Sequence, residues 1–281
     1  MSRLLLSSEN EIDCYLRSGK HDSSYQAWPG ANFLECAQHG TAALRQALIS
    51  TVRSRTAHAT VPKELLEMDV VALTRKAVEP MVRGLFPQDE QAAVLDVLAG
   101  SVVFLTPSNI DAVLSKMQWL HTAWNLGNLY LGGFDGELLS EDSPNLVGLS
   151  IETTCYVSVA YFRQESRFDD FVVHEAAHIF HNCKRETLGL REIRGRDFLL
   201  EIDFAKRETF AYACEVYSRI VELGDGPQER RILLSEYLQG PMPAEGEVDV
   251  DEYVDILNEA VAAGNGWRRI QQRCSNRRRK G

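Results

Sequence analysis

The sequence lacks any apolar segment long enough to cross a membrane. A transmembrane helix needs about 20 consecutive, mostly apolar residues, and no run in the 281 residues approaches that length. The opening segment, MSRLLLSSENE, has too short an apolar run for a signal peptide. We therefore expect a protein that has no membrane partner and is located in the cytoplasm.

Paired cysteines are also absent. The chain has six cysteines and no C-x-x-C pair among them. This spacing indicates neither a disulfide framework nor a zinc knuckle made of cysteine alone. Most of the thiols are expected to be small buried apolar groups, and a thiolate metal ligand at Cys155 or Cys183 is the less favoured alternative. The six residues are Cys14, Cys36, Cys155, Cys183, Cys214 and Cys274.

The sequence has no internal repeat, no glycine-rich phosphate loop and no nucleophile elbow. Its net charge is −10, but the last fourteen residues hold seven basic residues and no acid, so the rest of the chain carries −17. An acidic body disfavours nucleic acid as a partner. The basic tail could contact phosphate or an acidic partner, although such a tail is more often simply solvated.

One stretch, Phe171 to Asn182, carries a pattern with chemical meaning. It reads FVVHEAAHIFHN and contains the motif HExxH. Residues four apart lie on nearly the same face of an α-helix, so His174 and His178 can converge on one ion, and Glu175 lies about 100° round the helix. Neutral imidazole suits Zn²⁺, and a catalytic zinc has three protein ligands and an open position for water. Glu175 is placed to take a proton from that water.

The neighbouring residues favour a helix at this motif. Asp169 and Asp170 precede it, where an N-cap and a first turn favour carboxylates. The other positions of the stretch are apolar, which predicts a buried helix with one polar stripe. Buried polar groups need partners. The alternative to a metal site is a core helix whose histidines are satisfied by hydrogen bonds.

The first hundred residues are predicted to be mostly helical and show no cluster of chemically reactive residues. Apolar residues recur at helical spacing over residues 31–55. Thr60 is predicted to cap a short helix, and Asp69 a longer one that contains Pro80 and reaches Phe86. A further helix is predicted from Pro87 to Leu98.

Short strands are predicted between residues 101 and 162. Val102 to Leu105 is a short apolar run, and a helix from Ser108 to His121 follows it. Leu129 to Leu131 and Leu146 to Ile151 indicate further strand, separated by an acidic loop. Thr153 to Phe162 is rich in β-branched and aromatic residues. It is either an edge strand that pairs with an extended peptide or an internal strand of the sheet.

A second long helix is predicted from Leu199 to Leu223. Glu201, Glu208 and Glu215 lie seven residues apart, which puts them on one stripe of that helix. From the spacing alone, any of the three could complete a zinc site. A linker at residues 239–246 and a helix from Asp249 to Ala262 precede the basic terminus. These elements divide the chain into a helical region at 1–100, a core at 101–238 and a C-terminal region at 239–281.

The strand, the HExxH helix and the acidic helix together resemble the gluzincin branch of the zinc metallopeptidases. His174-Glu175-Ala176-Ala177-His178, followed by Glu208-Thr209-Phe210-Ala211, is similar to the HExxH plus ExxA pattern of minimal gluzincins such as the ImmA/IrrE type. The resemblance covers residues 102–223. It implies an α+β zincin-like fold with a small mixed sheet and makes Glu208 the third zinc ligand.

Two positions depart from the patterns of known zinc peptidases. Tyr212 follows the ExxA motif, where a polar residue that supports the ligands often stands, and only Glu215 or Asp203 could serve as an outer carboxylate. The metzincin pattern is absent, because His181 and Lys184 stand where its glycine and third histidine would be. His181 could be a ligand, contact substrate or be a satisfied buried histidine.

Two functions remain possible at this point. The first is a zinc-dependent peptidase in which His174, His178 and Glu208 hold Zn²⁺ and Glu175 is the general base, acting on a protein or peptide substrate. Tyr212, Tyr161 and His181 are candidates to stabilise the oxyanion. The second is a catalytically silent regulatory protein with the same fold that binds a protein or nucleic-acid partner. Glu175 favours the first, because a structural metal site needs no base.

Overall fold

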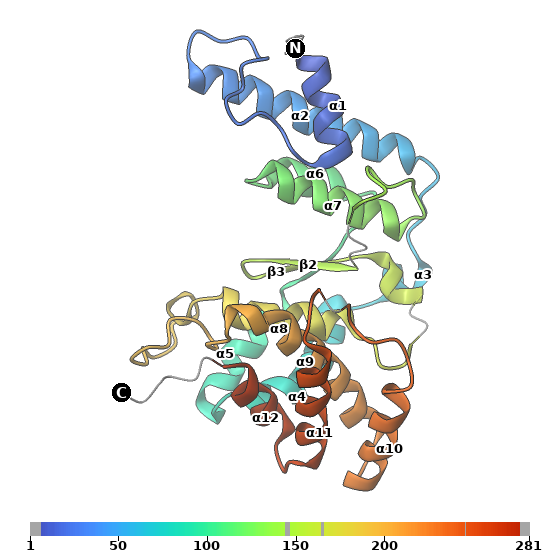
Figure 1. Cartoon of the computed structure of the whole chain (residues 1–281), viewed down its shortest axis with the longest axis vertical. Helices are drawn as coiled ribbons and strands as arrows, with labels where there is room; N and C mark the ends of the chain where they lie inside the picture. The colour runs from blue at the N-terminus through green and yellow to red at the C-terminus, as the bar shows by residue number, and fades with distance from the viewer. Residues whose placement is uncertain (1–6, 144–146, 164–165, 245, 276–281) are drawn as a thin grey trace. The chain divides into compact units, whose positions relative to one another are not determined.

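The computed structural model describes residues 7–143, 147–163, 166–244 and 246–275. It shows an α+β chain of many helices and one three-stranded sheet (Figure 1). The chain forms two compact units whose segments alternate along the sequence. Unit 1 comprises Met1–Leu66, Phe104–Val147 and Ser158–Phe162, and unit 2 comprises Glu67–Val103, Gly148–Val157 and Arg163–Gly281. The division into 1–100, 101–238 and 239–281 stays a prediction.

Unit 1 is built around α2 (Phe33–Arg55), which packs against α1 (Ser8–Ser18), α6 (Ile110–Lys116) and α7 (Leu120–Gly133). The helix predicted over residues 31–55 is confirmed as α2, and α3 (Lys63–Glu67) follows it in the sequence. The strand predicted at Leu129 to Leu131 is wrong, because these residues belong to α7. All residues from 126 to 131 are buried there, and a short apolar run does not distinguish a strand from a buried helix.

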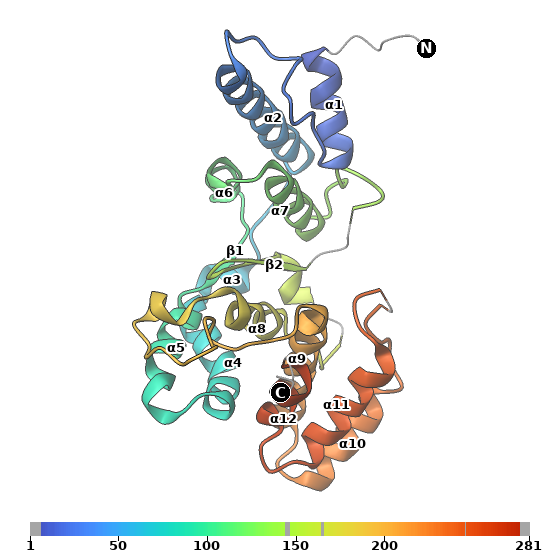
Figure 2. The same ribbon diagram turned by 60° about the vertical axis from the view of Figure 1, so that its left-hand side comes forward.

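Unit 2 contains the remaining helices (Figure 2). Asp69 caps α4 by accepting a hydrogen bond from the backbone of Ala72 at 3.0 Å, and Asp249 caps α11 in the same way. Both caps were predicted from the sequence, and Pro80 lies inside α4. The helices are α4 (Val70–Leu85), α5 (Gln88–Ala99), α8 (Phe171–Asn182), α9 (Arg207–Leu223), α10 (Pro227–Tyr237), α11 (Val250–Ala262) and α12 (Gly266–Cys274).

The sheet has the strand order β1-β3-β2. Its strands are β1 (Val102–Phe104), β2 (Gly148–Ile151) and β3 (Thr154–Val157), and β2 pairs with β3 in antiparallel register. The strand predicted at residues 153–162 corresponds to β3, which lies between β1 and β2 and is therefore internal. Its interpretation as an edge strand is wrong. The edge strand beside it is β2. The strand also stops at Val157, because Val159–Arg163 forms a 3-10 turn. Leu146, where the preceding strand was predicted to begin, lies outside the described residues.

Helices α8 and α9 pack against each other and form the centre of unit 2. Strands β2 and β3 pack on α8, and α4, α11 and α12 pack on α9. The second long helix starts at Arg207 and not at Leu199 as predicted. The backbone N–H groups of Leu199 and Leu200 instead donate to carbonyls of Cys183 and Phe180, near the end of α8. These hydrogen bonds between elements hold residues 199–203 outside the helix, and the 3-10 turn Phe204–Lys206 follows.

No helix in the described part of the chain is both long enough and apolar enough to span a membrane.

Candidate metal centre

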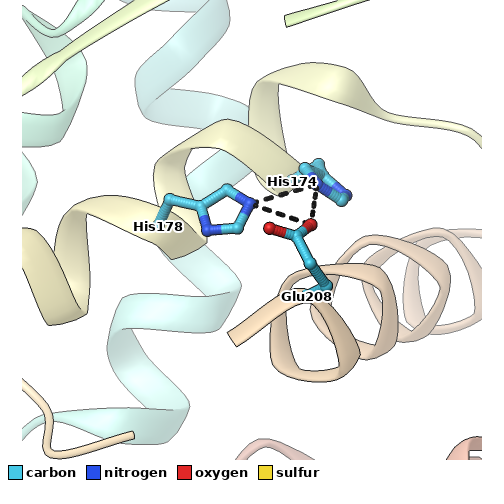
Figure 3. A group of neighbouring side chains, drawn as sticks. All are labelled: His174, His178 and Glu208. Atoms are coloured by element: carbon cyan, nitrogen blue, oxygen red, sulfur yellow. Dashed lines mark hydrogen bonds and ion pairs between the residues drawn. The ribbon is translucent and has the colours of Figure 1, made fainter. Parts of the chain in front are cut away.

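His174 and His178 lie one turn apart on α8 and face Glu208, in the first turn of α9 (Figure 3). The two Nε2 atoms are 3.2 Å apart. The Oε2 atom of Glu208 lies 3.7 Å from His174 Nε2 and 3.5 Å from His178 Nε2. Of the histidine, cysteine and acidic side chains in the described residues, these three form the group whose ligand atoms could hold a metal ion.

The spacing of the three atoms fits a tetrahedral zinc ion. Ligand atoms about 2.0–2.1 Å from a tetrahedral centre lie about 3.3 Å from one another. The three observed separations, 3.2, 3.5 and 3.7 Å, are close to that value. Two imidazoles and one carboxylate are also a known ligand set of catalytic zinc. The residues present therefore fit the ion that the sequence predicts.

The outer nitrogen of His174, Nδ1, is the ring nitrogen that does not face Glu208, and it contacts a carboxylate. His174 Nδ1 lies 3.0 Å from Oε2 of Glu215, a buried residue of α9. The other oxygen of Glu215 accepts the backbone N–H of Asp170 at 2.7 Å. An ionised carboxylate only accepts hydrogen bonds, so His174 donates from Nδ1, and Nε2 is the nitrogen that would bind a metal ion after losing its own proton. The sequence offered two candidates for an outer carboxylate, Glu215 and Asp203. Glu215 is the one that contacts a histidine of the group.

The outer nitrogen of His178 contacts another histidine. His178 Nδ1 lies 3.1 Å from Nε2 of His181, and His181 Nδ1 lies 3.1 Å from Oδ1 of Asn182. The amide oxygen of Asn182 accepts, so His181 donates from Nδ1 and in turn accepts from His178, which leaves His178 Nε2 free. Burial and the nearby His178 and Arg207 lower the pKa of His181 to about 3. His181 is the satisfied buried histidine of the three predicted alternatives.

The charges of the site are tightly coupled. Burial lowers the pKa of His174, but the hydrogen bonds that its ring donates to the carboxylates of Glu208 and Glu215 outweigh burial and raise that pKa to about 10. Burial likewise raises the pKa of Glu208, but His174 and His178 outweigh it and hold the carboxyl well below its usual range. Without a metal, a proton on the imidazole therefore balances the carboxylates. A divalent cation would replace that proton.

Asp170 caps α8 as predicted, from a buried position. Its Oδ1 accepts the backbone N–H groups of Val172 at 3.1 Å and Val173 at 3.2 Å. Burial, together with the nearby charge of Glu215, raises the pKa of Asp170 to about 6. The start of α8 is thus fixed by two carboxylates, since Glu215 accepts the N–H of the same residue.

Glu175 follows His174 on α8, and its buried side chain packs against β2. Its Oε2 accepts a hydrogen bond from Ser150 Oγ at 2.6 Å. A Cβ on Gly148 would lie only 2.5 Å from Glu175 Oε1, so any larger residue there would force the Glu175 side chain to move. The sequence indicated neither Ser150 nor Gly148, because the contacts arise from strand packing and no motif marks them.

The three candidates for stabilising an oxyanion lie in different surroundings. The ring of Tyr212 packs edge-on against His174, with 4.5 Å between ring centroids, and its hydroxyl donates to Glu247 at 2.8 Å. Burial and that hydrogen bond raise the pKa of Tyr212 well above its usual range. His181 contacts His178, and Tyr161 belongs to unit 1. Tyr212 and His181 therefore each contact a histidine of the group, and both ring nitrogens of His181 are already hydrogen-bonded.

The other acidic and thiol candidates are placed elsewhere. Glu201 lies before α9, where its Oε1 accepts the backbone N–H groups of Asp197 and Phe198. The expected single stripe of three glutamates is therefore wrong, because the helix begins after Glu201. Cys155 and Cys183 are buried free thiols, and burial raises the pKa of both, that of Cys155 to about 12.

No protein-family model, curated protein or solved structure matches the chain.

Proposed function

We propose that the chain is a zinc-dependent metallopeptidase, in which His174, His178 and Glu208 hold Zn²⁺ and Glu175 is the general base. The observation that carries the proposal is the meeting of two imidazole Nε2 atoms and the Glu208 carboxylate oxygen, 3.2–3.7 Å apart, with the buried carboxylate of Glu175 next to His174 in the sequence. The resemblance of HEAAH and ETFA to the motifs of minimal gluzincins supports a zincin-like fold. A structural zinc site is normally closed by a fourth protein ligand.

Zinc, when bound, would polarise the scissile carbonyl and acidify a water molecule. Glu175 removes a proton from the water whose oxygen bonds to the carbonyl carbon. It then donates this proton to the nitrogen of the departing amine as the carbon–nitrogen bond breaks. The side chain of Glu208 is 47% exposed, so the site is open to solvent and substrate on that side.

The position of β2 favours a peptide as the substrate. This edge strand packs on α8, and Ser150 contacts Glu175 from it. An exposed strand edge offers backbone hydrogen bonds to an extended peptide. A protein or peptide bound there would pass beside the general base. Six free cysteines suit a reducing compartment, so we place the activity in the cytoplasm.

The test compares the zinc-loaded protein with Glu175→Gln on fluorescein-labelled β-casein. Glutamine keeps the size of the side chain and an acceptor for Ser150 but cannot take a proton. Hydrolysis should fall by roughly 10² to 10⁴, the usual effect of losing a positioned base, while the zinc content stays near one per chain. Glu186→Gln, at an exposed glutamate outside the site, is the control and should keep full activity.

Three outcomes of this comparison would count against the proposal. Equal hydrolysis by wild type and Glu175→Gln would show that Glu175 is not the base. A zinc-loaded wild type that leaves β-casein intact would favour the regulatory alternative. Loss of zinc from Glu175→Gln would instead make Glu175 a ligand.

A further inference from the structure

Ser150, on β2, hydrogen-bonds the carboxylate that the proposed peptidase uses as its base. Its Oγ lies 2.6 Å from Glu175 Oε2 and 2.8 Å from the carbonyl oxygen of Glu175. A serine hydroxyl has one proton to donate, and the ionised carboxylate is the stronger acceptor of the two. The contact is therefore a charge-assisted hydrogen bond that holds one oxygen of the carboxylate.

Gly148 limits the position of the other oxygen. It lies two residues before Ser150, on the same face of β2. A Cβ at this position would be 2.5 Å from both Cγ and Oε1 of Glu175, so only glycine lets the carboxylate lie this close to the strand. Within the described residues, Ser150 is the side chain that donates to this carboxylate. No hydrogen bond to Oε1 is present among the described residues, so this oxygen is the one assigned to take the proton from water.

The backbone of Ser150 faces the outer edge of the sheet, which pairs with no further strand within the described residues. Ser150 pairs with Cys155 on β3, and the N–H of Cys155 donates to the carbonyl of Ser101, on the β1 side. In an antiparallel pair, residues opposite each other alternate between bonding each other and pointing outward. The backbone N–H of Cys155 points away from β2. The backbone N–H and C=O of Ser150, its partner in the pair, therefore point away from β3. Its side chain holds the base while its backbone is available to a bound strand.

We propose that Ser150 is a positioning residue that fixes the Glu175 carboxylate relative to a peptide paired with β2. This inference rests on the proposed peptidase function and adds to it a link between substrate binding and the base. Ser150 would act on turnover through the orientation of Glu175 and have little effect on peptide affinity, because its backbone groups are unchanged by substitution of the side chain. A serine that only satisfies a buried acceptor would affect stability and leave turnover unchanged.

The first experiment measures kcat and KM of the zinc-loaded protein on β-casein. Ser150→Ala should lower kcat by roughly 10- to 100-fold, the range for residues that orient a reactive group, and change KM by less than about twofold. In a Glu175→Gln background, Ser150→Ala should lower kcat by less than about twofold, because the effects of residues that act as a unit are not additive. Ser101→Ala is the control: Ser101 is a buried serine that donates to Leu98 and does not touch Glu175.

A second pair of variants guards against misfolding of Ser150→Ala. Ser150→Thr and Ser150→Val have nearly the same volume and both suit a strand, so they differ mainly in the hydroxyl. Threonine should keep kcat within about threefold of the wild type, and valine should lose as much as alanine. Equal kcat for threonine and valine, or a faster Ser150→Ala, would overturn the proposal.

A third experiment needs neither zinc nor activity. In the metal-free protein, chemical denaturation should show that Ser150→Ala lowers the folding equilibrium constant by about tenfold or more, as expected for a hydrogen bond to a charged group. In a Glu175→Ala background, Ser150→Ala should lower the folding equilibrium constant by at most about threefold. There the substitution removes only a hydrogen bond to the backbone carbonyl of residue 175. Equal effects in both backgrounds would show that the carboxylate contact does not exist in solution.

The two proposals fail in different ways. If the wild type cleaves β-casein, Glu175→Gln does not, and Ser150→Ala equals Ser101→Ala, the inference about Ser150 is wrong and the peptidase function stands. If the wild type does not cleave, or Glu175→Gln cleaves equally, the peptidase function is wrong and the role of Ser150 falls with it. The denaturation cycle then still decides whether the hydrogen bond forms.

Discussion

The two histidines of the candidate metal centre have different partners on their outer nitrogens. His174 donates to the carboxylate of Glu215, whereas His178 donates to the neutral imidazole of His181. A carboxylate partner makes an imidazole a stronger ligand than a neutral partner does. The hydrogen bonds fix both ring orientations, but of these two partners only Glu215 carries a negative charge.

Replacing Glu215 should therefore weaken zinc binding without abolishing it. Glu215→Gln should lower zinc affinity by roughly 10- to 100-fold, the usual cost of losing an outer-shell partner, because glutamine keeps an acceptor and loses the charge. Glu208→Ala, which removes a ligand, should cost more, and Glu201→Ala should have no effect. Competition with a fluorescent zinc chelator measures all three. A larger loss for Glu201→Ala than for Glu208→Ala would contradict the assignment.

Zinc binding should also release a proton. The pKa of His174 is about 10 without metal, so at pH 7 this imidazole is protonated and must lose its proton to become a ligand. Apparent zinc affinity should therefore rise with pH, by about tenfold per unit for this one group, until pH approaches 10. Calorimetry in buffers of different ionisation enthalpy should show about one proton released by His174 at pH 7. A binding constant that is flat from pH 6 to 8 would be the contrary result.

At the scale of the element, the start of α8 combines a stabilising cap with a costly charge. The pKa of Asp170 is raised from 3.8 to about 6, so the folded state binds this proton more tightly than the unfolded state. The contribution of Asp170 to stability consequently falls as pH rises from about 4 to 6, and the full cost of the charge is present above about pH 6. The cap itself favours Asp and Asn equally.

Asp170→Asn should therefore stabilise the metal-free protein at pH 8, by about 1–3 kcal/mol, and have a smaller effect near pH 4.5. Asp170→Ala removes the cap and should be about 1 kcal/mol less stable than Asp170→Asn at both pH values. Chemical denaturation of both variants at the two pH values makes the comparison. If asparagine destabilises the protein at pH 8 as much as alanine does, the buried charge is not costly.

The elements that could be predicted are those whose signals are local. The caps Asp69, Asp170 and Asp249 lie at the start of α4, α8 and α11 as predicted, because an N-cap depends only on the next three residues. The start of α9 could not be predicted, because residues 199 and 200 bond to carbonyls near the end of α8. Ser150 was missed for the same reason, since only the packing of β2 on α8 brings it to Glu175.

At the scale of the whole molecule, part of the basic C-terminal segment is paired with acidic residues of unit 2. Three of the seven basic residues near the C-terminus lie on α12, and Arg269 and Arg273 are both paired with Glu259. The part of the expected solvated basic tail that lies on α12 is therefore partly balanced by Glu259. The other four, Arg277, Arg278, Arg279 and Lys280, lie outside the described residues. The rest of the chain is strongly acidic.

The measurement that tests the central claim most directly is the zinc content of the purified protein and of two variants, His174→Ala and His178→Ala. The wild type should contain about one zinc per chain, and each variant should contain almost none, because two remaining ligands bind zinc weakly. Thermal unfolding should show that both variants still fold. Zinc at full stoichiometry in both variants, or a folded wild type that binds no zinc when it is supplied, would contradict the account.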